Sequence, residues 1–106
     1  MEVSKKDWKL YREKLPSWQE AYMEKLVASY VTYLESEKPA STKFWGLEKK
    51  IKHDRKNPGV LMELSKQDMP FDLLRLIQEK VITTDDLEEF SDELKEAVNF
   101  MLERFN

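Results

Sequence analysis

Apolar residues recur at every third or fourth position along this chain, and no useful length of it alternates apolar with polar residues. The first spacing is typical of one face of a helix, whereas the second would indicate a strand. Only 2 glycines occur among 106 residues, which fits long helices. The pattern therefore predicts an all-α fold, a compact bundle of five or six helices within a single domain, residues 1–106.

Prolines and capping residues set the boundaries of the predicted helices. These cover residues 5–15, 17–35, 41–56, 58–66, 70–81 and 84–105. Pro16 is expected to end the first helix, because proline interrupts the backbone hydrogen bonds of a helix. Residues 1–36 would then form an N-terminal helical hairpin and residues 41–106 a helical core. Two alternatives stay open: a short strand over 59–64, and a break of the last helix at Ser91.

Three pairs of polar residues have the spacing of a capping box, in which a side chain at the helix start and another three positions later bond each other's backbone. They are Ser4 with Asp7, Ser17 with Glu20, and Thr83 with Asp86. The helix over 70–81 is apolar on most sides, which predicts a central position. We expect the apolar stripes of the second, third and fourth helices to face a core: Met23, Leu26, Val27, Tyr30 and Leu34; Phe44, Leu47 and Ile51; Val60, Leu61 and Leu64.

The last predicted helix carries apolar residues at alternating steps of three and four over almost three heptads. They are Leu87, Phe90, Leu94, Val98, Met101 and Phe105. Such spacing is typical of a seam between two helices. We therefore expect these residues to form an oligomer seam that joins two copies of the chain into a homodimer.

Charge is divided unequally along the chain, although the net charge of the whole is only −3. Residues 1–56 carry 13 Lys/Arg against 9 Asp/Glu, and residues 57–106 carry 5 against 12. The densest basic stretch contains a group of candidate partner-binding residues, Trp45, Lys49, Lys52, Arg55 and Lys56. Together they could hold a phosphate backbone and stack a base, although a dedicated nucleic-acid binder is usually basic overall.

The same stretch contains the only histidine, in the sequence His53-Asp54-Arg55. Neighbouring residues on a helix point in different directions, so these three cannot form a catalytic triad among themselves. We interpret them as the cation-rich end of a helix, with His53 facing solvent. Gly46, inside the same predicted helix, is expected to mark a close approach of another helix.

The sequence gives little support for metal binding, cofactor binding or catalysis. The chain has no cysteine and one histidine, which leaves a poor ligand set for zinc. The acidic run over residues 85–96 lacks the glycine that a calcium loop of the EF-hand type needs. We therefore expect no catalytic residue, cofactor, metal or membrane span, and a cytoplasmic location, for which the lack of cysteine is suitable.

Two stretches, Trp45–Glu63 and Val81–Glu96, resemble a small family of uncharacterised bacterial proteins. The likeness covers about a third of the chain and implies a bacterial origin, but it transfers no catalytic or binding residue. Taken together, the residues predict a non-enzymatic protein-interaction module that associates with itself through its C-terminal helix. The alternative hypothesis is a nucleic-acid accessory protein acting through the basic helix over residues 42–56.

Overall fold

The computed structural model describes residues 1–105, and all the regular structure in that range is helical. It consists of α1 (Lys5–Leu34), α2 (Ala40–Asp54), α3 (Met69–Gln78), a short 3-10 helix η1 (Thr84–Leu87) and α4 (Asp92–Phe105). The described residues thus confirm the all-α class but contain four α-helices, so the expected count of five or six is not confirmed.

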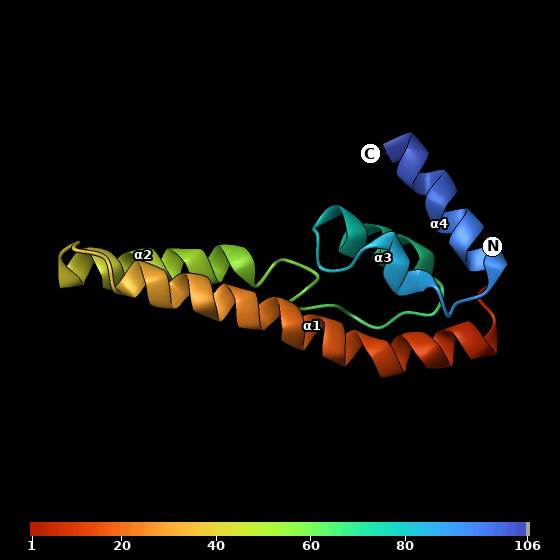
Figure 1. Cartoon of the computed structure of the whole chain (residues 1–106), viewed down its shortest axis with the longest axis horizontal. Helices are drawn as coiled ribbons and strands as arrows, with labels where there is room; N and C mark the ends of the chain where they lie inside the picture. Colours follow the sequence, from red (N-terminus) through yellow and green to blue (C-terminus); the bar gives the residue numbers. More distant parts are fainter. Residues whose placement is uncertain (106) are drawn as a thin grey trace.

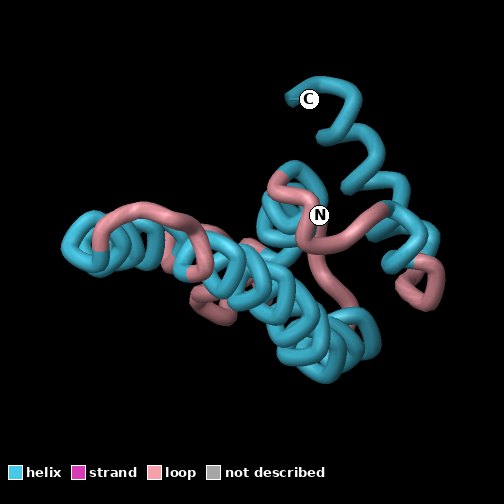
Figure 2. Tube along the Cα trace, turned by 60° about the vertical axis from the view of Figure 1, so that its left-hand side comes forward, coloured by secondary structure: helices cyan, strands magenta, loops and turns pink. Residues whose placement is uncertain are grey.

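The molecule is elongated, with extents of 52 × 27 × 21 Å, and has two parts. The second half of α1 and the antiparallel α2 extend to one end, while α3, η1 and α4 gather over the first half of α1 (Figure 1). We call residues 19–59 the arm and the other described residues the head. Figure 2 shows the arm as two neighbouring helices joined by one loop.

Helix α1 does not end at Pro16, contrary to the prediction. Its start is as expected, since the Ser4 hydroxyl accepts a hydrogen bond of 3.1 Å from the Asp7 amide. A proline inside a helix costs about 3 kcal/mol. Here Tyr11 and Leu15, before the proline, and Trp18, after it, pack on the same head core, whereas Pro16 itself is exposed. Packing on both sides of Pro16 therefore keeps the helix continuous, and residues 1–36 form no separate hairpin.

The segment over residues 58–66 is not a helix, so that prediction is also wrong. The Asn57 side chain accepts a 2.8 Å hydrogen bond from the Gly59 amide and the Asn57 backbone carbonyl accepts one of 3.0 Å from the Leu61 amide, but this single turn is not continued into a helix. The chain then crosses without regular structure from the arm to the head. Leu61 and Leu64, expected to point inward, are 71% and 53% exposed.

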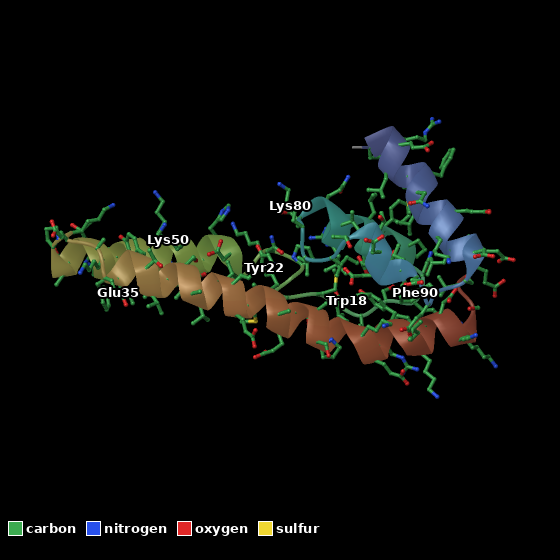
Figure 3. All side chains as sticks on the ribbon, viewed as in Figure 1. Trp18, Tyr22, Glu35, Lys50, Lys80 and Phe90 are labelled. Carbon is green, nitrogen blue, oxygen red and sulfur yellow. The ribbon has the colours of Figure 1, made fainter. Side chains whose placement is uncertain are left out.

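The hydrophobic core lies in the head. It is formed by α3 and α4 with η1 and the first half of α1, and its fully covered side chains include Tyr11, Met69, Leu73, Leu76, Leu87, Leu94 and Val98. The central position predicted for α3 agrees with its six buried residues. The Trp18 and Phe90 rings approach within 6.4 Å between centroids, which ties α1 to the segment before α4 (Figure 3).

The last predicted helix is interrupted at Ser91, the alternative left open from the sequence. The expected capping box of Thr83 and Asp86 is formed, but it starts the short η1 and not a long helix. The Ser91 hydroxyl accepts a bond of 3.3 Å from the Leu94 amide and so caps α4. Ser91 also donates to the buried Asp7 carboxylate through its backbone amide, at 3.0 Å, and its hydroxyl, at 2.5 Å. These bonds fasten the start of α4 to the start of α1.

Candidate interaction surfaces of the arm

The two arm helices contact each other through a tyrosine-rich side of α1. Tyr33 donates its hydroxyl proton to the Thr42 carbonyl at 3.0 Å, and its ring lies against Gly46. A Cβ atom added at Gly46 would overlap the Tyr33 hydroxyl. The close helix approach expected at Gly46 is therefore present, and Tyr33 is the residue that requires the glycine.

A second tyrosine joins the two helices nearer the head. Tyr30 donates a hydrogen bond of 2.5 Å to the Asp54 carboxylate. Partial burial, and then the charge and hydrogen bond of Asp54, raise the pKa of Tyr30 to about 12. The Tyr30 hydroxyl is the donor of this bond, which helps to set the alignment of α2 along α1.

One side of the arm is polar and cationic. Ser29, Lys49 and His53 line the same shallow opening there, together with Lys38 and Lys50. The ammonium groups of Lys50 and Lys38 lie 4.7 and 5.5 Å from the centre of the Tyr33 ring, as in cation–π contacts. His53 is exposed in this opening, as expected from the sequence.

The opposite side of the arm is apolar. Successive residues of a helix are about 100° apart, so Val27 lies about 160° from Ser29 around α1, and Ile51 about 160° from Lys49 around α2. The residues on this side are Met23, Val27, Val31 and Leu34 from α1, with Phe44, Leu47 and Ile51 from α2. All of them except the half-buried Leu47 are exposed, from 38% at Met23 to 64% at Phe44. We call these seven residues the apolar face.

The apolar face is the feature that sequence reasoning missed. The sequence prediction placed all of its residues except Val31 in a core, yet α2 contains no buried residue at all. A signal was present in the sequence. On α1, the row Tyr22, Leu26 and Tyr33 faces α2, and the row of Met23 and Val27 lies one residue further around the helix. Two adjacent apolar rows are wider than one neighbouring helix can cover.

Three of the candidate partner-binding residues, Trp45, Lys49 and Lys52, lie on α2, and Arg55 and Lys56 follow its end. Trp45, Lys49, Lys52 and Lys56 follow one another at steps of four, three and four, which places them in one row; all are exposed. Lys52 also pairs with Glu48 at 3.6 Å. Arg55 does not belong to this row: it lies about 60° from Lys52, toward the margin of the apolar face.

The residues of the predicted oligomer seam pack mostly within the chain itself. Leu87, Phe90, Leu94 and Val98 are buried in the head core, with exposures of 3% or less. Met101 is half-buried against the same core, and only Phe105, at 63%, is well exposed. The spacing correctly marked positions that are buried, but Leu87 and Phe90 lie outside α4, and these residues pack on α3 and α1 of the same chain.

Titratable groups also meet inside the head. The Tyr11 hydroxyl is buried and finds no hydrogen-bond partner among the described residues. Desolvation, and next the charge of Asp72, raise the pKa of Tyr11, and desolvation likewise raises that of Asp72. Within the described range no cluster of three or more His, Cys, Asp or Glu side chains is arranged to hold a metal ion.

No family model, curated protein or solved structure matches this chain. The resemblance of residues 45–63 and 81–96 to a bacterial family therefore assigns no family. Among the helices of residues 1–105, none combines the length and the apolar character needed to cross a bilayer.

Proposed function

We propose that the protein is a non-enzymatic interaction module whose arm binds a protein chain through the apolar face. The observation that carries this proposal is the position of six exposed apolar side chains on one side of two paired helices. Contiguous exposed apolar patches are uncommon on monomeric proteins and usually mark a contact with another molecule.

The shape of the surface suggests the kind of partner. Amphipathic helices bind apolar helical surfaces through residues spaced three and four apart. The head supplies a stable base, because the buried half of α1 continues directly into the arm. Binding would then require little rearrangement of the backbone.

Photocrosslinking from single positions tests this function. A photoreactive residue replaces Val27 or Ile51 on the apolar face, and Ser29 or Lys49 serves as the matched control on the polar side. Irradiation of the purified chain, and of a lysate of the cells that make it, should give discrete protein adducts from the first two positions only. Equal adducts from all four positions, or none from Val27 and Ile51, would contradict the proposal.

A second candidate function is supported by the row Trp45, Lys49, Lys52 and Lys56. An exposed indole next to aligned lysines resembles the combination of base stacking and phosphate attraction in proteins that bind single strands. Trp45 and Lys49 of this row line an opening beside Tyr33, on the side of the arm opposite the apolar face, so both surfaces of the arm could operate at once.

This candidate predicts binding that weakens steeply as salt rises. Replacing Lys49, Lys52 and Lys56 by Glu should abolish binding of single-stranded DNA or RNA in a fluorescence anisotropy titration at low salt. The slope of log K against log salt of the parent chain should correspond to about three released counterions. An equal affinity of parent and triple variant would eliminate the nucleic-acid hypothesis and leave the apolar face unaffected.

A further inference from the structure

We propose that the apolar face is occupied by a second copy of this chain, with the two arms packed in parallel and both heads at the same end. This inference rests on the proposed function and names its partner. Self-association would then occur through the arm and not through the C-terminal helix, whose apolar side is already covered.

The arm lacks the second layer that helices need for stability. Most helical stability in proteins comes from packing of an apolar side, yet none of the 15 residues of α2 is buried. A second hairpin placed on the apolar face would convert the two-helix arm into a four-helix bundle. Small helical domains commonly obtain their missing core in this way, by oligomerisation.

The two halves of the apolar face match each other in position along the arm. Tyr33 contacts Gly46, and the Gln19 amide donates to the Pro58 carbonyl at 3.1 Å, so these pairs lie at equal heights. By the same register, Phe44 lies level with Leu34 and Ile51 with Val27. A two-fold axis parallel to the arm then stacks α2 of one copy on α1 of the other.

This stacking pairs the two rows residue by residue. Phe44 of one copy meets Leu34 of the other, Leu47 meets Val31, and Ile51 meets Val27. Each contact occurs twice because the symmetry makes the interface isologous. The apolar rows of α1 and α2 are centred at the same position along the arm, so the face is complementary to a second copy of itself. This match favours a second copy as the partner over an unrelated helix.

Charges at the margins of the face select the parallel arrangement. Glu24 lies three residues before Val27 at the outer margin on α1, and Arg55 lies four residues after Ile51 at the outer margin on α2. Both are exposed. In the parallel dimer, Glu24 of each copy comes opposite Arg55 of the other. With the heads at opposite ends, α1 would instead pack on α1, and Glu24 would come opposite Glu35, acid against acid.

The head does not obstruct this arrangement. Tyr11, which is buried against the head core, lies about 160° around α1 from Val27. The head therefore projects from the side of α1 that points away from the apolar face. Two copies joined by their arms would carry their heads on opposite outer sides of the bundle.

Sedimentation equilibrium of the purified full-length chain tests the second copy. The parent should sediment as a dimer at micromolar concentration, and the double variant Val27→Asp/Ile51→Asp as a monomer. The matched control Ser29→Asp/Lys49→Asp should remain dimeric. Circular dichroism shows whether each variant keeps its helices at low concentration, as expected from the exposure of the replaced residues.

A charge exchange tests the arrangement without touching the apolar contacts. Glu24→Arg alone and Arg55→Glu alone should each weaken the dimer about tenfold or more, because both symmetric pairs become repulsive. An equimolar mixture of the two variants should associate with nearly parental affinity, because a heterodimer restores both opposite-charge pairs. Glu35→Arg should have little effect.

The outcomes separate the inference from the function on which it rests. A parent chain that stays monomeric at high micromolar concentration overturns the second copy, while adducts of another mass from Val27 would still support the proposed function. A dimer that Glu24→Arg does not weaken, or that the mixture does not restore, overturns the parallel arrangement. Absence of both dimer and adducts removes the inference and the function together.

Discussion

Helix α1 belongs to both parts of the molecule, and its two halves differ in what covers them. In the head, Tyr11 and Leu15 are at most 4% exposed, whereas in the arm Val27 and Val31 are 55% and 48% exposed. Sequence composition does not explain this difference, since both halves carry apolar residues at helical spacing. The difference separates a half that packs against the head core from a half whose apolar side the described residues leave exposed.

The largest expected contrast comes from matched truncations in the two parts. Leu94 is fully buried in the head, so Leu94→Ala should lower the free energy of unfolding by about 2–5 kcal/mol. Val27→Ala in the arm should change it by less than about 1 kcal/mol, because the side chain is already more than half exposed.

Urea denaturation followed by circular dichroism measures both values, at a concentration low enough to keep the chain monomeric. Similar losses for the two variants would mean that the arm is packed as tightly as the head. The assignment of the apolar face as an unoccupied surface would then be wrong.

The second prediction concerns the bonds that join the ends of the head. The buried Asp7 carboxylate accepts both the amide and the hydroxyl of Ser91. Asp7→Asn places an amide group where an acceptor is needed and should cost about 2 kcal/mol of stability. Asp92→Asn is the matched control at the start of α4, because the Asp92 side chain is 91% exposed and pairs with Lys95 at the surface. Its effect should stay within about 0.5 kcal/mol, and a comparable loss for both variants would refute the role of Asp7.

In the arm, the contact at Gly46 predicts that Gly46→Ala lowers stability when Tyr33 is present and raises it when Tyr33 is replaced by alanine. Gly46→Ala improves helix propensity by up to about 1 kcal/mol, but the new Cβ displaces the Tyr33 ring and its bond to Thr42. We expect a net destabilisation of about 1 kcal/mol in thermal or urea unfolding. With Tyr33→Ala already in place, the same glycine substitution should be stabilising, since the obstruction is gone. Additive effects in the double variant would show that Tyr33 is not the partner of Gly46.

Local signals in the sequence predicted the helix start at Ser4, the capping box at Thr83 and the apolar side of α3. Ser4 and the Thr83–Asp86 box act within a few residues, and the apolar side of α3 needs no knowledge of its neighbours. The continuity of α1 through Pro16 depends on head residues distant in the sequence, and a local rule therefore misplaced it. Long-range packing also decided that Leu94 and Val98 meet α3, and that Val27 stays more than half exposed among the described residues.

The smallest expected effect lies in the head and depends on pH. Asp72 is buried, and desolvation followed by the nearby Asp68 charge raises its pKa above the ordinary value, against a smaller lowering by Arg75. Because the folded state holds the proton more tightly than the unfolded chain, ionisation of Asp72 opposes folding. The stabilisation that protonated Asp72 contributes is fully present below about 3.9, its pKa in the unfolded chain, and is lost as the pH rises through its pKa in the folded state.

Asp72→Asn, which stays neutral, should therefore be more stable than the parent at pH 7, and the difference in stability should shrink as the pH falls toward about 4. Urea midpoints at several pH values measure this difference, with the exposed Asp85→Asn as the control. A difference that is independent of pH would mean that Asp72 acts through its shape and not its charge.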